Sequence, residues 1–306
     1  MKPVTVGERE QADINAQVDK ILRGLGIAEP PIRLEDVREL LRLDRKFYST
    51  TDDSVLHEVI SRIRVAAKQI ILRPTILVDV VRKAKLSALW IPDRKRILID
   101  GDLPKIKHRW AEAHEISHAI TEWHQGFLFG DSKEELHPAC LAELEAEANY
   151  GAGQLLFLRG RFAAEARDMA LGLKSVKTLS DRFGNTITST LWRYVEQTGN
   201  RRPMVALVTP HPKRLPDDHD PMSPCRYFVG SSAFVERFSA LTEVELFAKV
   251  TAYCRPARGG PLGADELCLV DVNGDDHLFH FETFFNRHEA LTLGYHKSLK
   301  PIRVAV

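Results

Sequence analysis

Two histidines four residues apart, in the stretch HEISH at residues 114–118, constrain this chain more than any other feature. Residues i and i+4 project from one face of an α-helix, about one turn apart. His114 and His118 can therefore offer their imidazole nitrogens to a single cation only if this stretch is helical. Three apolar residues fall on roughly the opposite side of such a helix: Ile116, Ile120 and Trp123. The pattern predicts a helix that lies between a hydrophobic core and a site.

Glu115 directly follows the first histidine and completes the pattern H-E-x-x-H. In zinc peptidases with this pattern the two histidines hold the metal, and the glutamate acts as general base for water at an open coordination position. Because the chain contains 12 histidines, chance supplies such a motif in on the order of a few per cent of similar sequences. A surface helix with solvated histidines is the alternative, so a third ligand is needed.

The third ligand is predicted on the next helical segment, LAELEAEANYGAGQLL. At about 100° per residue, five apolar side chains form one stripe: Leu141, Leu144, Ala148, Ala152 and Leu155. Glu145 falls inside this stripe, whereas Glu143 and Glu147 fall outside it and are expected to be solvated. A buried carboxylate is costly unless it is paired or binds a metal, so we expect Glu145 to complete the site. A buried arginine as its partner is the alternative.

Neighbours of these residues are candidates for supporting roles. Asn149 lies one turn after Glu145, where it could orient Glu145 or a ligand histidine, or equally satisfy backbone groups. We also hypothesise that the Cys140 thiolate occupies the open zinc position in a resting enzyme; an inert cysteine at a helix start is the alternative. The oxyanion-stabilising residue is not assigned, although four polar side chains lie nearby in sequence: Tyr150, Trp123, His124 and His137.

The hydrophobic periodicity predicts an α+β protein with two domains. Helical spacing recurs at about 14–25, 34–43, 54–71, 75–85, 105–123, 139–158 and 161–172, and the runs SALWIP and RILID predict a β-hairpin before the HEISH helix. Beyond residue 203 the candidate strands are MVALV, CRYFV, LFAKVTAYC, LCLVDV and HLFHF, with a hairpin turn at Asn273-Gly274. We therefore expect a mostly helical, zincin-like domain over residues 1–199 and a β-rich domain over residues 203–306.

The segment 176–198 has the pattern of a helix-turn-helix, with Gly184 in the turn and Thr186 placed to cap the second helix. Candidate phosphate contacts are Lys177, Thr188, Ser189 and Arg193. DNA affinity depends mainly on phosphate neutralisation, and few basic residues line the second helix, so packing against the peptidase core is favoured. A basic surface elsewhere is the other route to DNA: Arg159, Arg161 and Arg167, or Arg201 and Arg202. The DNA-binding residues stay unknown.

The overall charge favours no particular partner, because 43 lysines and arginines balance 42 aspartates and glutamates. The N-terminal residues contain no apolar signal region, and no run approaches the roughly 18 apolar residues of a membrane span. The four cysteines are widely spaced without a C-x-x-C pair, which argues against a disulfide scaffold or a thiolate zinc cage. A cytoplasmic location is expected.

Three stretches together resemble the ImmA/IrrE family of zinc metallopeptidases: IPDRKRILID, RWAEAHEISHAI and ELEAEANYGAGQLL. The resemblance covers roughly residues 10–198 and extends through PPIRLEDV and LSDRFGNTITSTLWRY. It implies that His114, His118 and Glu145 bind zinc and that Glu115 is the catalytic base. Two features depart from the family pattern: the segment 53–85 is longer, and LLFLRG stands where a methionine-proline often closes the ligand helix.

The resemblance also implies a biological role. Members of the family are typically site-specific endopeptidases that cleave a helix-turn-helix repressor and thereby induce DNA-damage, mobile-element or phage-defence genes. Some carry a C-terminal GAF-like sensory domain, which is compatible with residues 203–306. Such a protease needs restraint. This domain would provide it, or activity would depend on an activator such as DNA, including single-stranded DNA. The alternatives are a DNA-binding regulator with a structural zinc site and an antirepressor that binds its repressor without cleaving it.

Overall fold

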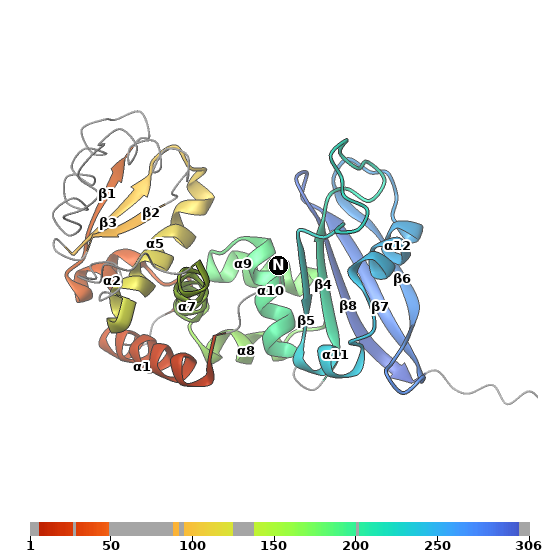
Figure 1. The fold of residues 1–306 in the computed structure, drawn as a ribbon, viewed down its shortest axis with the longest axis horizontal. Coiled ribbons are helices and arrows are strands. Elements are labelled where there is room, and N and C mark those ends of the chain that lie inside the picture. Colours follow the sequence, from red (N-terminus) through yellow and green to blue (C-terminus); the bar gives the residue numbers. More distant parts are fainter. Residues whose placement is uncertain are drawn as a thin grey trace, which may run out of the picture. The chain divides into compact units, whose positions relative to one another are not determined.

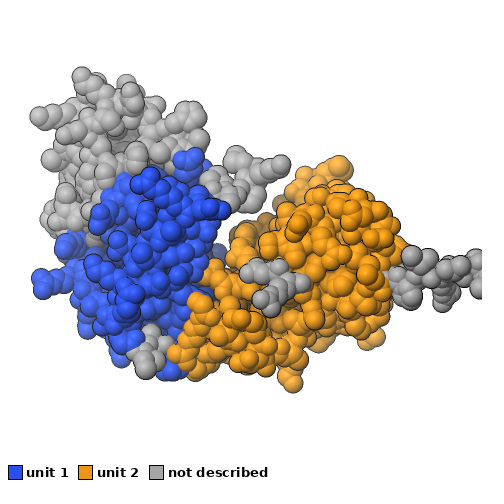
Figure 2. All heavy atoms as spheres, turned by 90° about the horizontal axis from the view of Figure 1, so that it is seen from below, with its two compact units in different colours: residues 1–159 blue, residues 160–306 orange. Residues whose placement is uncertain are grey.

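The computed structural model describes residues 6–26, 29–48, 88–91, 95–124, 138–199 and 202–299. The chain divides into two compact units, Met1–Arg159 and Gly160–Val306, which Figure 2 colours separately. Both units combine helices with a β-sheet, so the predicted α+β class is confirmed. Several predicted features lie outside the described residues: the helices at 54–71 and 75–85, His137, Arg201 and the side chain of Cys140. Among the described helices, none is long and apolar enough to span a bilayer.

The first unit combines helices with a three-stranded sheet, and the helix that carries the HEISH motif packs on this sheet (Figure 1). Its elements are α1 (Glu8–Gly24), α2 (Leu34–Leu41), β1 (Asp44–Tyr48), β2 (Ala88–Ile91), β3 (Arg96–Asp100), α5 (Lys105–Ile120) and α7 (Pro138–Leu156). Strands β2 and β3 pair antiparallel, which confirms the predicted hairpin. The sequence did not predict β1, which pairs parallel with the other edge of β3. Its sequence, DRKFY, lacks an alternating apolar pattern, and an ion pair of 2.7 Å joins Asp44 to Arg96 across the register.

Helix α7 lies between α5 and α1, and a glycine permits its close approach to both. A Cβ atom at Gly151 would lie 2.1 Å from Oγ of Ser117 on α5 and 3.1 Å from Cγ2 of Ile14 on α1. The Ser117 hydroxyl is buried and has no hydrogen-bond partner among the residues that the structure describes. The spacing of α5 and α7 therefore depends on the missing side chain at residue 151.

The variant Gly151→Ala is expected to lower the free energy of unfolding by about 1–2 kcal/mol. Overpacking costs about 1–3 kcal/mol, and the better helix propensity of alanine returns up to about 1 kcal/mol. Adding Ser117→Ala removes the 2.1 Å contact and should recover much of the loss. Urea unfolding of the metal-free proteins measures these differences.

Gly153→Ala is the matched control on the same helix, because a Cβ atom there meets no described atom within 4 Å. This control is expected to gain up to about 1 kcal/mol through helix propensity alone. Equal effects of the two glycine substitutions would contradict the close-packing interpretation.

The second unit is a five-stranded antiparallel sheet with helices on both faces (Figure 1). Its elements are α8 (Gly160–Arg167), α9 (Leu173–Phe183), α10 (Ile187–Thr198), β4 (Met204–Thr209), β5 (Tyr227–Gly230), α11 (Ser232–Arg237), α12 (Glu243–Tyr253), β6 (Gly260–Val270), β7 (Asp276–Phe285) and β8 (Ala290–Leu299). The strand order is β5-β4-β8-β7-β6. All six residues of β4 are buried, because α11 and α12 share a core with one face of the sheet and α10 packs on the other. The predicted hairpin at Asn273-Gly274 joins β6 to β7, with Gly274 at a φ of 87°.

One predicted strand in this unit, LFAKVTAYC, is wrong, because its residues LFAKVTAY belong to helix α12 and the cysteine is the C-cap of this helix. Thr242 and Glu245 form a capping box immediately before this segment, each side chain bonding the backbone N–H of the other. Leu246, Phe247 and Val250 then bury one helical face. The capping pattern T-x-x-E was present in the sequence and outweighs the β-branched residues that suggested a strand.

The boundary between the compact units lies at Arg159/Gly160, not between residues 199 and 203 as the sequence suggested. Helices α8, α9 and α10 belong to the second unit. On α10, Leu191, Tyr194 and Val195 are completely buried, and the helix contacts β4 and β5. The β-rich segment therefore folds together with the helices that precede it.

The helix-turn-helix-like segment is committed to this packing. Thr186 caps α10 as predicted, since its side chain accepts a hydrogen bond from the Ser189 N–H. Of the candidate phosphate contacts, Arg193 is only 8% exposed and the Thr188 hydroxyl donates to Glu289 at 3.3 Å. Lys177 is exposed. The helix α10 thus has a structural role in the sheet, which disfavours its use as a DNA-recognition helix.

Candidate metal centre

Helices α5 and α7 bring His114, His118 and Glu145 together in the first unit. The Nε2 atoms of the two histidines are 3.2 Å apart, and they lie 3.2 Å and 3.6 Å from the Glu145 carboxylate oxygens. A tetrahedral zinc ion with bonds of about 2.0–2.1 Å separates its ligand atoms by about 3.3 Å. The donor set and its spacing therefore fit zinc. The predicted juxtaposition is present, while metal binding itself stays a prediction.

The prediction of Glu145 as the third ligand rested on its burial, and this predicted burial is wrong. The Glu145 side chain is 60% exposed, whereas Glu147, which was expected to be solvated, is only 9% exposed. The buried face of α7 is wider than the apolar stripe and includes Glu147, Gly151 and Gln154, which places Glu145 at its edge. Glu145 thus reaches the histidines from the rim of the helix, where the centre is open to solvent.

Hydrogen bonds orient His114 toward this cluster. Its Nδ1 lies 3.1 Å from Oδ1 of Asn149, so Nδ1–H donates to the amide oxygen and Nε2 faces the Glu145 carboxylate. Burial lowers the pKa of His114, but the hydrogen bond to Glu145 and nearby negative charge outweigh it, and the pKa is raised. Hydrogen bonds from the two histidines hold the pKa of Glu145 well below its usual range. Asn149 therefore occupies the orienting position that the sequence suggested.

His118 is oriented by a second set of side chains that the sequence reasoning did not assign. Its Nδ1 lies 2.8 Å from Nδ1 of His124, and Nε2 of His124 lies 2.8 Å from the Glu147 carboxylate. Trp123 Nε1–H donates to the same carboxylate oxygen at 2.6 Å. His124 is completely buried, and this burial lowers its pKa, which favours the neutral imidazole.

Glu115 is buried beside the cluster, being only 6% exposed. The three described candidates for oxyanion stabilisation are committed elsewhere: the Tyr150 hydroxyl bonds Asn15 on α1, and Trp123 and His124 bond Glu147. Since the side chain of Cys140 lies outside the described residues, the thiolate hypothesis stays a prediction.

Comparisons with known proteins identify no family for the chain. No protein-family model matches it, and no curated protein matches it. One solved structure, entitled "Mycobacterium tuberculosis transcriptional regulator", aligns with 98% of this chain and 94% of its own at 12% sequence identity and a TM-score of 0.49. A likeness of this size says nothing about the activity of this protein.

The basic residues considered for DNA binding are partly neutralised. Arg159 forms a two-pronged ion pair with Asp19, and Arg161 pairs with Glu165 at 3.0 Å. Arg167 and Arg202 are exposed. Ion pairs therefore engage two of the four described candidates, Arg159 and Arg161.

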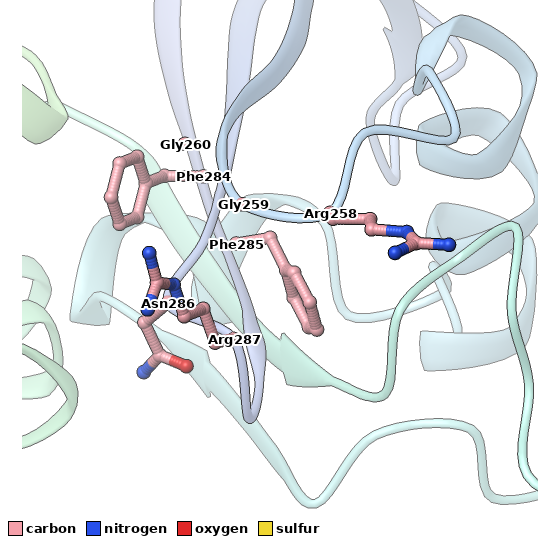
Figure 3. Close-up of a pocket in the computed structure, with 7 residues that line it drawn as sticks. All are labelled: Arg258, Gly259, Gly260, Phe284, Phe285, Asn286 and Arg287. Carbon is pink, nitrogen blue, oxygen red and sulfur yellow. The ribbon is translucent and has the colours of Figure 1, made fainter.

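The second unit contains an open hollow of about 590 Å³ (Figure 3). It is lined by Arg258, Gly259, Gly260, Phe284, Phe285, Asn286 and Arg287. The guanidinium groups of Arg258 and Arg287 point in opposite directions, as do the rings of Phe284 and Phe285. A ligand site needs polar groups that converge, so the candidate metal centre is the better-formed site.

Proposed function

We propose that this protein is a zinc-dependent endopeptidase. The observation that carries the proposal is the convergence of two imidazole nitrogens and one carboxylate at tetrahedral spacing, with Glu115 next to the first histidine. A structural zinc site is closed by four protein ligands, whereas a catalytic one keeps a position open. Among the described residues the cluster has three members, and the exposed Glu145 lies at its rim.

The chemistry follows from the roles of these side chains. Bound zinc supplies Lewis acidity, which makes water a nucleophile at about pH 7 and polarises the scissile carbonyl. Glu115 accepts the proton of the attacking water and delivers it to the leaving amine. Asn149 keeps His114 in the tautomer that presents Nε2 to the centre.

The proposed substrate is a helix-turn-helix transcriptional repressor, which is cut at a specific site so that the genes it represses are expressed. The resemblance of residues 10–198 to ImmA/IrrE peptidases supports this substrate class. We further propose that the second unit is the sensory, GAF-like part that restrains the protease in the cytoplasm. A DNA-binding regulator with structural zinc is less well supported, because Arg193 of the helix-turn-helix-like segment is buried.

Metal removal tests the proposal. The zinc-loaded protein is mixed with purified helix-turn-helix repressors encoded next to its own gene. Cleavage of the substrate is expected to give two discrete fragments, and mass spectrometry identifies their junction. Treatment with a zinc chelator should stop their formation, and added zinc should restore it. Because a sensory unit can restrain the enzyme, the assay is repeated with single-stranded DNA.

Two other outcomes contradict the proposal. An intact repressor that co-elutes with the protein under all conditions identifies a non-cleaving antirepressor. Fragments that form equally with the chelator identify a contaminating protease.

A further inference from the structure

Behind His118, on the side of the ring away from Glu145, two buried side chains and one half-buried side chain continue the hydrogen bonds: His124 and Glu147, and then Trp123. The Glu147 side chain is 11% exposed and that of His124 is not exposed at all. Burial of a carboxylate and an imidazole is costly unless each of their polar atoms is bonded. Here Nδ1 and Nε2 of His124 both have partners, and one Glu147 oxygen accepts from two donors.

The positions of the protons in this chain follow from its chemistry. An ionised carboxylate only accepts hydrogen bonds, so Nε2 of His124 must donate to Glu147. A neutral imidazole that donates through Nε2 accepts through Nδ1, and therefore Nδ1 of His118 must be the donor in the 2.8 Å contact. With its Nδ1 proton held in this way, a neutral His118 that binds zinc would present its Nε2 lone pair, and Nε2 is the nitrogen that faces Glu145 and His114.

We propose that His124 and Glu147 are positioning residues that hold His118 in its metal-binding tautomer and orientation. The inference rests on the proposed zinc site. Histidines that bind metals commonly donate their second ring N–H to a carboxylate or carbonyl, and such partners affect metal affinity. In this protein the Glu147 carboxylate acts through the imidazole of His124, so one ring separates its negative charge from His118.

A different role for His124 is suggested by its spacing from the motif. Residues 114–124 read HEISHAITEWH, which matches H-E-x-x-H-x-x-G-x-x-H, a pattern whose last histidine is a third zinc ligand, except that Thr121 replaces the glycine. The geometry opposes this role, because His124 contacts Nδ1 of His118, whereas the ligand cluster is formed on the Nε2 side. His124 therefore lies behind a ligand and is not a ligand itself.

Three substitutions separate positioning from packing. His124→Leu keeps an apolar side chain of similar bulk but cannot accept a hydrogen bond, and is expected to lower zinc affinity about 10–100-fold. His124→Asn places an amide oxygen near the position of Nδ1, so it should stay within about threefold of wild type. Glu147→Gln keeps the shape and loses the charge, and should give an intermediate loss. Zinc affinity is measured by competition with a chromophoric chelator, and the visible spectrum of the cobalt(II)-substituted protein reports the ligand geometry.

Two reference variants calibrate these measurements. His118→Leu removes a proposed ligand. His108→Leu removes a histidine of the same helix whose Nε2 bonds the Leu103 carbonyl at 2.8 Å, and it is expected to leave zinc affinity unchanged. Thermal unfolding of the metal-free proteins shows whether each variant folds. If His124→Leu does not fold, the affinities of His124→Asn and Glu147→Gln decide.

The expected order of zinc affinity is wild type, His124→Asn, Glu147→Gln, His124→Leu and then His118→Leu. If both His124→Leu and Glu147→Gln keep the zinc affinity and the cobalt spectrum of the wild type, the inference is overturned. The hydrogen bonds among His118, His124 and Glu147 would then serve only packing. If His124→Asn loses zinc as completely as His118→Leu, His124 is a ligand and the inference is also overturned. None of these measurements uses repressor cleavage, so the inference can stand even if the proposed peptidase activity fails.

Discussion

Replacing Glu115 by glutamine is expected to lower the rate of repressor cleavage by about 10²–10⁴-fold while leaving zinc bound. The amide keeps the shape of the side chain but cannot take a proton from water. Glu115 does not belong to the three side chains whose donor atoms converge, so the zinc content of the variant should equal that of the wild type. The combination of full zinc content and lost turnover distinguishes a catalytic base from a metal ligand.

The measurement is a single-turnover time course with excess enzyme, together with metal analysis of the same samples. Glu143→Gln is the matched control, because this glutamate of α7 is exposed and has no assigned role. Cleavage by Glu115→Gln within about tenfold of the wild-type rate would show that another group accepts the proton. Loss of zinc from this variant would show that Glu115 supports the fold of the site.

The helices that carry the site were predictable because their signals are local. The i, i+4 spacing places His114 and His118 on one face of α5 whatever the tertiary structure, and the hairpin before it follows from two short apolar runs. The closing of the cluster by Glu145 was also predicted, although for a wrong reason. An exposed carboxylate at the edge of α7 reaches the histidines, whereas the buried one, Glu147, lies behind them.

The features that were missed depend on contacts between distant segments. Strand β1 is rich in charge and becomes a strand only because β3 offers it a parallel edge. The unit boundary differs from the predicted one because α10 buries an apolar face on β4 and β5. Helical periodicity shows that one face of a helix is buried, but it does not show which element covers that face. The role of His124 was missed for the same reason, since Glu147 comes from another helix. By contrast, the helix α12 could have been predicted from its capping box.

Replacing Glu145 by alanine is the second large effect that we expect, with a loss of zinc affinity of about 100-fold or more. Structural zinc with four ligands contributes about 10–16 kcal/mol, or roughly 3 kcal/mol for each ligand. A change of 1.4 kcal/mol is about tenfold in affinity. If Glu145 were only a surface ion-pair partner of protonated histidines, its removal would cost about 0–1 kcal/mol of folding stability and would not weaken zinc binding. The two interpretations therefore predict zinc affinities for Glu145→Ala that differ by more than a factor of about ten.

Competition titration with a zinc chelator measures this difference, with Glu143→Ala as the control two residues away on the same helix. Thermal unfolding of metal-free Glu145→Ala should stay close to that of the wild type, because a side chain that is 60% exposed contributes little to the core. A zinc affinity equal to that of the control would exclude Glu145 as a ligand. The cluster would then supply only its two histidines as zinc ligands. A catalytic centre would require a third protein ligand from outside the cluster.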